Sequence, residues 1–134
     1  AYWGGMLKEG ATSFWEKYNP AETGTQHLAM YGRPYGKSLC HAWGASPIYL
    51  LGKYYLGVKP TKPGYEEFSI TPCLGGLKWM EGTVPTPQGN IHIYMDKKVI
   101  RVKADGGRGV VNIPTKKGIK TMTVEAGKEQ VFKY

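Results

Sequence analysis

Cysteine is scarce in this sequence, and histidine is scattered. The 134 residues contain two cysteines, Cys40 and Cys73, and neither belongs to a CxxC motif. No spacing among His27, His41 and His92 resembles a zinc site, so we expect no metal and no cofactor. We expect both thiols to be free and buried, and a single disulfide between them is the alternative. Cysteine usage therefore leaves the cellular compartment open.

The sequence also has no long apolar run. No stretch of about 18 apolar residues is present, and no basic-then-apolar leader precedes the first segment. We therefore expect no membrane-spanning segment and no membrane partner. Because the sequence begins with Ala1 rather than Met, we expect a processed chain or a piece of a longer protein.

Acidic side chains are fewer than basic ones, 10 against 18, which gives a formal net charge of +8. A basic balance can indicate a nucleic acid or an acidic polysaccharide as a partner. Here, however, several lysines and arginines of the second half alternate with Val and Ile, as on the solvent face of a sheet. We therefore expect no nucleic-acid partner. The glycine cluster at residues 105–109 lies between expected strands and indicates a hairpin turn rather than a nucleotide site.

The first expected helix covers residues 6–18. Apolar residues recur there with i, i+3, i+4 spacing, and Asn19-Pro20 ends the pattern. Residues 19–37 have no period, and loops of this length are often functional. Tyr31, Arg33 and Tyr35 in this loop either line a site or only pack over one.

A second helix is expected over residues 38–57. Ser38 is a good N-cap, Pro47 should kink or restart the helix, and Gly57 should end it. Apolar side chains lie almost all round this helix, a pattern typical of a helix buried in a larger helical body. Two helices alone cannot bury that surface between themselves, so we expect them to pack on the rest of the chain or on helices outside it.

After Val58 the period drops to two, so the rest of the chain is expected to form strands. The turn-rich stretch Lys59–Gly64 marks the expected boundary, with a helical part at residues 1–59 and a β domain at residues 60–134. Short strands separated by turns at this spacing predict an antiparallel sandwich or barrel. The expected strands are residues 65–71, 77–84, 90–95, 98–104, 109–113, 119–124 and 129–134.

The first candidate for chemistry is Glu16, which lies among Phe14, Trp15 and Tyr18. Apolar rings around a carboxylate reduce its hydration and raise its pKa. Sugar-cleaving enzymes use carboxylates in such surroundings, where rings cover the apolar faces of the sugar and the acid moves protons. The alternative is a solvated glutamate beside aromatic residues of the core.

Several motifs resemble bacterial α-L-rhamnosidases. Residues 10–16, GATSFWE, resemble the G-A-T-T-x-W-E motif near the end of the catalytic barrel of that family, and residues 38–43, SLCHAW, resemble its S-x-N-H segment. Residues 57–72 resemble the exit from the barrel, and residues 75–79 and 85–91 resemble the start of the C-terminal β-sandwich. One departure is Cys40, where the family usually has Asn.

The resemblance implies an α+β fold, with two helices from the end of an (α/α)6 barrel followed by an antiparallel β-sandwich. It also implies inverting hydrolysis of terminal α-L-rhamnose, which needs two carboxyl groups about 6.5–9.5 Å apart with a water beside one of them. By resemblance, Glu16 is the base that activates this water, His41 contacts the bound sugar, and Trp15 shapes the pocket. The family's general acid lies upstream of these motifs. We therefore expect a C-terminal fragment, inactive alone, whose partners are the upstream barrel and a rhamnose-containing glycan.

Two alternatives concern the β domain. It is a stand-alone carbohydrate-binding module if Trp79, Tyr94 and Tyr134 form an exposed platform for sugar rings. It is a purely structural cap if these aromatic residues are buried. We expect Trp79 to pack in the core, because that is the ordinary place for a tryptophan in a small β domain.

Overall fold

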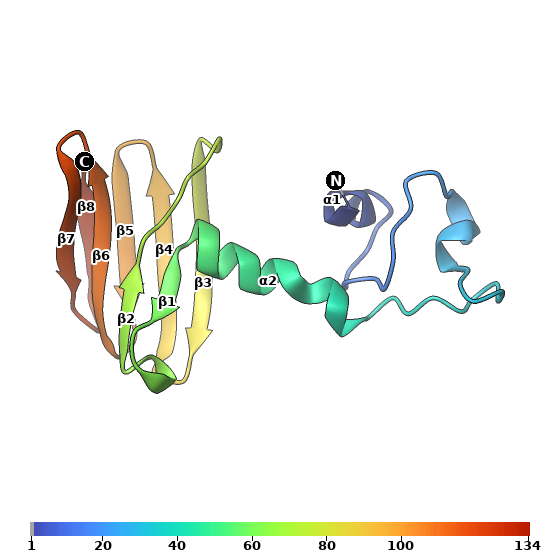
Figure 1. The fold of residues 1–134 in the computed structure, drawn as a ribbon, viewed down its shortest axis with the longest axis horizontal. Helices are drawn as coiled ribbons and strands as arrows, with labels where there is room; N and C mark the ends of the chain where they lie inside the picture. The colour runs from blue at the N-terminus through green and yellow to red at the C-terminus, as the bar shows by residue number, and fades with distance from the viewer. Residues whose placement is uncertain (1) are drawn as a thin grey trace. The chain divides into compact units, whose positions relative to one another are not determined.

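The computed structural model describes residues 2–134, which form two compact units, divided between residues 49 and 50. Short helices and two four-stranded β-sheets are both present, so the predicted α+β class is confirmed (Figure 1). The domain limits expected from the sequence, residues 1–59 and 60–134, stay a prediction.

Helix α1 opens the first unit and is short, Tyr2–Lys8. It ends because Gly10 takes a left-handed conformation, with φ of 81°. The amide of Gly10 then donates to the carbonyl of Leu7 at 3.1 Å, and that of Ala11 donates to the carbonyl of Met6 at 2.9 Å. These two bonds form a Schellman end, which turns the chain out of the helix. The predicted helix over residues 6–18 is therefore wrong beyond its first turn.

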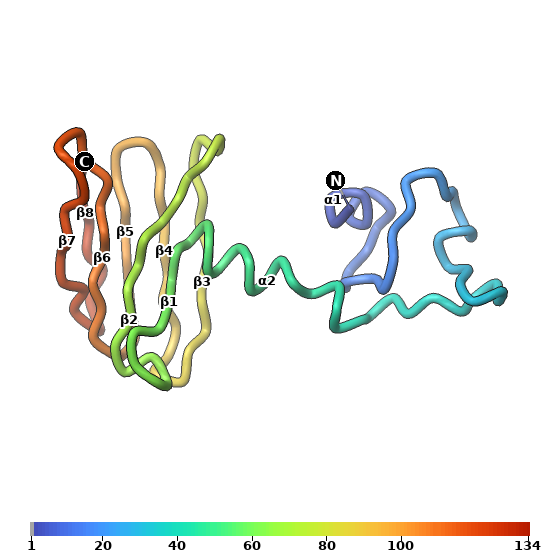
Figure 2. Tube along the Cα trace, in the orientation of Figure 1, coloured from blue at the N-terminus to red at the C-terminus, as the bar shows by residue number. Residues whose placement is uncertain are grey.

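Residues 9–41 form an irregular loop that is folded back on itself (Figure 2). Two backbone hydrogen bonds hold its two ends side by side. The amide of Glu16 donates to the carbonyl of Ser38 at 2.9 Å, and the amide of His41 donates to the carbonyl of Phe14 at 2.8 Å. The expected long loop at residues 19–37 is present, and one 3₁₀ turn, η1, Gly24–Leu28, lies within it.

Three consecutive helical turns replace the single helix expected over residues 38–57. They are the 3₁₀ turn η2, Ala42–Ala45, the helix α2, Ser46–Leu50, and the π turn η3, Leu51–Tyr55. The N-cap is His41, so the predicted cap at Ser38 is wrong. Pro47 lies in the first turn of α2, where its missing N–H is tolerated, so the helix does restart there. Gly57, with φ of 75°, follows the last turn and ends it as expected.

This helical segment is not buried within the described chain, and the expectation that it packs on helices outside the chain stays a prediction. Most of its large apolar side chains are exposed, including Trp43, Ile48, Leu51, Tyr54 and Tyr55. Exposed apolar side chains gathered in this way usually mark a contact surface for another protein segment.

The second unit is a β-sandwich whose two layers are visible in Figure 1. One sheet has the order β1-β2-β6-β7 and the other β3-β4-β5-β8. The strands of the first sheet are β1 Val58–Pro60, β2 Glu67–Ile70, β6 Arg108–Thr115 and β7 Gly118–Val124. Those of the second are β3 Trp79–Thr86, β4 Gly89–Asp96, β5 Val99–Ala104 and β8 Glu129–Lys133.

All seven predicted strands are present, and two features differ from the prediction. Strand β1 was expected to be part of a linker, because Lys59 and Pro60 resemble turn residues; it pairs with β2 at the edge of its sheet, where proline is tolerated. Strands β2 and β6 pair in parallel, whereas every other pair of named strands is antiparallel. A short 3₁₀ turn, η4, Pro63–Tyr65, separates β1 from β2.

The core lies between the two sheets and follows the two-residue period. In β5, Ile100 and Val102 are buried while Arg101 and Lys103 are exposed. The opposite sheet contributes Phe68, Ile70, Val111 and Ile113 to the same cluster. Apolar and polar residues alternate along these strands because one face of each sheet packs on the other sheet and the opposite face is exposed to water.

Candidate functional site

Glu16 lies at a bend in the irregular loop, not on a helix. Two hydrogen bonds hold its backbone: its amide donates to the carbonyl of Ser38, as described above, and its carbonyl accepts from Trp43 Nε1 at 2.9 Å. Nearby, the Ser13 hydroxyl donates to the Leu39 carbonyl and so ties the same two stretches of the loop together. The position of the carboxylate is thus fixed by residues more than twenty positions away in the sequence.

The Glu16 carboxylate is half-buried and receives two hydrogen bonds. The Tyr31 hydroxyl donates to Oε1 at 2.5 Å, and the backbone amide of Ser38 donates to Oε2 at 3.1 Å. The Tyr31 hydrogen bond, followed by that of Ser38, lowers the pKa of Glu16, and the charges of His41 and Lys37 act in the same direction. The same contact raises the pKa of Tyr31, because the phenol is a donor to an anion.

This direction is opposite to the one expected from the aromatic neighbours. Trp15 is buried, whereas the neighbouring Glu16 is only half-buried, so the two side chains have different surroundings. Within the described residues, the hydrogen-bond partners of the carboxylate are the Tyr31 hydroxyl and the Ser38 amide. Polar donors surround it instead, so Glu16 is ionised in the neutral range, as a base requires.

Trp15 lies in the buried part of the first unit, with 7% of its surface exposed. Its ring centroid is 5.9 Å from that of His27, and the ring of Tyr18 stacks on the His27 imidazole with centroids 5.5 Å apart. A cavity of about 490 Å³ is lined by Trp15, His27 and Leu39 among other residues, but not by Glu16. The structure therefore does not bring Trp15 together with the carboxylate, and its role toward a sugar stays a prediction.

His41 caps the first helical turn and lies close enough to Glu16 to lower the pKa of that carboxyl. Its ring centroid is 4.4 Å from that of Trp43, whose ring is largely exposed. Glu16, His41 and Trp43 thus come together at the start of the helical turns. Sequence reasoning missed the contact with Trp43, which the helical pattern of residues 38–57 had assigned to packing.

A buried ion pair supports the loop behind the carboxylate. The Lys37 side chain is fully buried, and its Nζ lies 3.0 Å from Glu22 Oε2. The hydrogen bond from Lys37 lowers the pKa of Glu22. His27 lies 3.7 Å from both Glu22 and Glu9. Because Lys37 precedes Ser38, this anchor fixes the amide that donates to Glu16.

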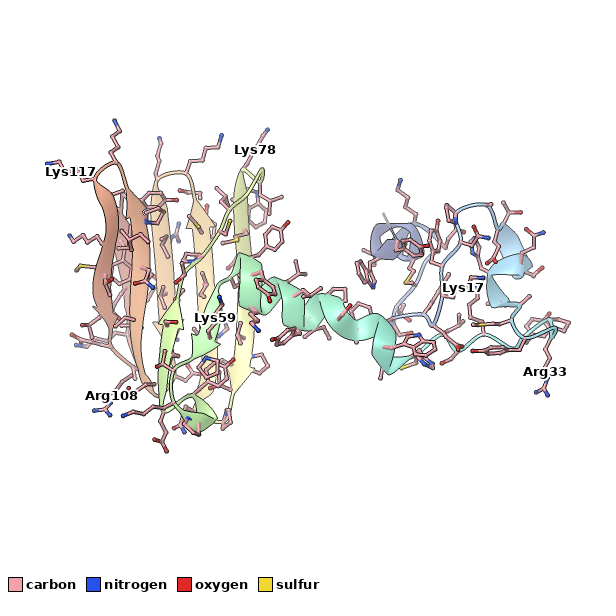
Figure 3. All side chains as sticks on the ribbon, in the orientation of Figure 1. Lys17, Arg33, Lys59, Lys78, Arg108 and Lys117 are labelled. Atoms are coloured by element: carbon pink, nitrogen blue, oxygen red, sulfur yellow. The ribbon has the colours of Figure 1, made fainter. Side chains whose placement is uncertain are left out.

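Of the three loop residues singled out from the sequence, one reaches the site. Tyr31 bonds to Glu16, whereas Tyr35 is exposed and Arg33 points away from the loop into solvent (Figure 3). Basic residues of the second unit, such as Lys78, Arg108 and Lys117, also extend outward. The expected solvated sheet surface is seen on β5, where Arg101 and Lys103 are exposed.

The aromatic residues of the sandwich form a separate feature. Trp79 is 57% exposed, so the expectation that it packs in the core is wrong. Its ring is nearly parallel to that of Tyr94, with an interplanar angle of 17° and centroids 6.4 Å apart, and Arg101 lies over Tyr94 at 4.7 Å. The hydroxyl of Tyr134 donates to the Asp96 carbonyl at the same end of the sheet. By the criterion set from the sequence, the exposed ring of Trp79, nearly parallel to the half-buried ring of Tyr94, favours sugar binding by this face.

Other expectations concern metals, membranes and thiols. Within residues 2–134, no group of three metal-binding side chains comes together, and no described helix is long and apolar enough to cross a membrane. Cys40 and Cys73 are free, as expected, but both are exposed, so their predicted burial is wrong.

Comparisons with known proteins agree with one another. Residues 57–115 match the family described as the bacterial α-L-rhamnosidase C-terminal domain. A curated α-L-rhamnosidase of Alteromonas sp. (strain LOR) is 35% identical over 94 residues, which are 68% of this chain and 10% of the relative. The chain therefore spans about a tenth of the length of that relative.

Solved structures show the same fold. The α-L-rhamnosidase from Dictyoglumus thermophilum matches with a TM-score of 0.69 at 19% identity. The match covers 97% of this chain and 17% of the rhamnosidase chain. The Streptomyces avermitilis α-L-rhamnosidase complexed with L-rhamnose has a TM-score of 0.70 at 18% identity, over 98% of this chain and 14% of its own. The resemblance predicted from the motifs is therefore confirmed: the chain is similar to part of an α-L-rhamnosidase, and its residues 57–115 match the C-terminal domain of the bacterial family.

Proposed function

We propose that this chain supplies the general base of an inverting α-L-rhamnosidase, and that Glu16 is that base. The observation that carries the proposal is the pair of hydrogen bonds from Tyr31 and Ser38, which keeps the carboxylate ionised beside His41. The similarity to α-L-rhamnosidases names the substrate class, a terminal α-L-rhamnosyl linkage.

In the proposed reaction, Glu16 takes a proton from water while the water oxygen attacks the anomeric carbon of rhamnose. The bond to the departing oxygen breaks, and that oxygen leaves with a proton from a separate acid. The products are rhamnose of inverted anomeric configuration and the free alcohol. In this proposal His41 contacts the bound sugar, and Trp15 shapes the pocket.

One carboxylate cannot both accept the proton of the water and donate one to the leaving group in the same step. We therefore infer that the acid belongs to an upstream helical barrel of the same polypeptide, and that the chain alone is inactive. The exposed apolar side chains of α1 and of residues 42–55 support such a partner. Tyr2, Trp3 and Leu7 on α1, and Ile48 and Leu51 further on, need a covering surface.

The test is a chimera in which this chain replaces the matching stretch of the Alteromonas α-L-rhamnosidase. Glu16→Ala should lower the hydrolysis of an aryl α-L-rhamnoside by about 10²–10⁴-fold, the usual contribution of a general base. Azide should restore turnover and give a rhamnosyl azide of inverted configuration, because this anion needs no deprotonation. The control is Glu66→Ala, which removes an exposed carboxylate on the sandwich.

Full activity of the Glu16→Ala chimera would refute the proposed base. Turnover by the 134-residue chain alone, at the rate of the chimera, would refute the need for an external acid.

A second function, carbohydrate binding by the sandwich, is favoured by the exposed ring of Trp79 and the nearly parallel, half-buried ring of Tyr94. Flat aromatic faces bind the apolar faces of sugar rings, and Arg101 and Asp96 nearby offer hydrogen-bonding groups. In this proposal the sandwich holds a glycan while hydrolysis takes place at Glu16.

A further inference from the structure

Tyr31 occupies an unusual backbone position at the tip of a tight turn. The amide of Met30 donates to the carbonyl of Arg33 at 3.0 Å, and the amide of Arg33 donates to the carbonyl of Met30 at 2.9 Å. Between them Tyr31 and Gly32 both have positive φ, 54° and 72°. This is the geometry of a type I′ turn, which glycine, asparagine and aspartate adopt easily and a tyrosine does not. The conformation of Tyr31 therefore needs a compensating interaction.

That interaction is the hydrogen bond to Glu16. The Tyr31 side chain is 69% exposed, so burial of its ring does not hold it in place. Its hydroxyl nevertheless donates to Glu16 Oε1, fifteen residues away in the sequence. A hydrogen bond to an ionised acceptor is about twice as strong as one between neutral groups.

The base of the turn is held to the rest of the unit. Gly36 lies so close to the Met30 carbonyl that an added Cβ would be 2.3 Å from its oxygen. The amide of Lys37 donates to the carbonyl of Leu28 at 3.0 Å, and its buried ammonium pairs with Glu22. The turn is thus anchored at both ends, and it presents the phenol to the carboxylate.

The two donors act on different oxygens of Glu16. Tyr31 bonds to Oε1 and the Ser38 amide to Oε2, so rotation of the carboxylate about its last torsion would break both bonds. We propose that Tyr31 is a positioning residue for the base, which holds the Glu16 carboxylate oriented and ionised for the attacking water. This inference rests on the proposed function, because it assigns Tyr31 its role through Glu16.

The proposal predicts a change in the titration of Glu16. The groups that act on its carboxyl are the Tyr31 hydroxyl, the Ser38 amide and the charges of His41 and Lys37. Tyr31→Phe removes the first of these and keeps the ring, and the two backbone hydrogen bonds between Met30 and Arg33 do not involve the lost hydroxyl. The pH midpoint of the Glu16 titration should then rise, because the carboxylate has lost its strongest hydrogen-bond donor.

The measurement is a pH titration of the 134-residue chain with ¹³C-labelled glutamate carboxyls, in which Glu16→Gln identifies the resonance. The control is Tyr35→Phe, the same change on the same loop, at a side chain that is 77% exposed. A third variant carries 3-fluorotyrosine at position 31, a more acidic phenol of nearly the same shape, which should lower the midpoint. If Tyr31→Phe and Tyr35→Phe titrate alike, the proposal is wrong.

The catalytic consequence is read in the chimera described above. Tyr31→Phe should lower kcat about tenfold and shift the acid limb of the pH–rate profile upward, while KM stays within about twofold. An unchanged kcat and profile would overturn the positioning role. If Glu16→Ala leaves the chimera active while Tyr31→Phe still moves the Glu16 midpoint, the proposed function fails and the contact between the two residues stands, so the two failures are distinguishable.

Discussion

Gly109 on β6 is a position at which even the smallest added group should disturb the core of the sandwich. It faces Phe68, its partner in the parallel β2–β6 pair, whose side chain is 2% exposed. A Cβ on Gly109 would lie 2.1 Å from Phe68 Cε2 and 2.4 Å from Cζ. Carbon atoms in contact are about 3.5–4.0 Å apart, so the ring would have to move by roughly 1.5 Å within a packed core.

The expected cost of Gly109→Ala follows from this geometry. Overpacking of a core typically destabilises a protein by about 1–3 kcal/mol. The φ of Gly109 is not positive, so alanine is compatible with the backbone and offsets about 0.4–1 kcal/mol by restricting the unfolded chain. We therefore expect a net loss of about 1–2 kcal/mol in the free energy of unfolding of the second unit.

The assay is urea unfolding of the whole chain, followed by the amide NMR signals of β2 and β6. The control is Gly76→Ala, at a glycine with no positive φ and no heavy atom within 4 Å of an added Cβ, where we expect no loss. Phe68→Leu should relieve the clash, so the double variant should be more stable than the sum of the single changes predicts, with a coupling of about 0.5–3 kcal/mol. If Gly109→Ala and Gly76→Ala unfold at the same urea concentration, the reasoning from packing is refuted.

Two further predictions concern Glu67 and Trp79. The hydrogen bond from Lys62, followed by the charges of Lys62 and Arg108, lowers the pKa of Glu67, so its contribution to stability is present above its ordinary pKa of 4.5 and is lost as the pH falls through the lowered value. Glu67→Gln should therefore lower the urea midpoint of unfolding at pH 7 but leave it unchanged at a pH below the lowered pKa. If the two proteins still differ in urea midpoint at that acid pH, the stabilising role of the ionised Glu67 is contradicted. Trp79→Ala should abolish retardation of the chain in affinity electrophoresis with a rhamnose-containing polysaccharide, while Val131→Ala, a truncation of another exposed apolar side chain in the same sheet, should not. Equal retardation of both variants would argue against sugar binding by Trp79.

The strands could be predicted from the sequence because their information is local. In Val99-Ile100-Arg101-Val102-Lys103 the alternation places every second side chain in the core, and no distant residue has to be known. Strand β1 could not be found in this way, because Lys59 and Pro60 look like turn residues until β2 pairs with them. Trp79 was misplaced because it starts an edge strand, where the pattern does not say which of Trp79 and Met80 faces inward.

The site depended on information that is not local. The apolar period of residues 6–18 predicted a helix, but Gly10 closes α1 with a Schellman end, and the following residues pair with residues 38–41 instead. Glu16 then receives its donors from Tyr31 and from the Ser38 amide, fifteen and twenty-two residues away. Local composition showed three aromatic neighbours and therefore predicted the wrong direction of the pKa shift. The motif identified the residue, and only the folded loop reveals its environment.

The parallel pairing of β2 with β6 has a consequence for how the sandwich can be divided. Between these two adjacent strands the chain passes through β3, β4 and β5, all of which belong to the opposite sheet, and it returns there once more in β8. Neither sheet can be completed during synthesis before the other has begun, and a break at any hairpin leaves partners missing from both. A transplant that stops at residue 115, the end of the matched family region, would omit β7 and β8 and expose one edge of each sheet.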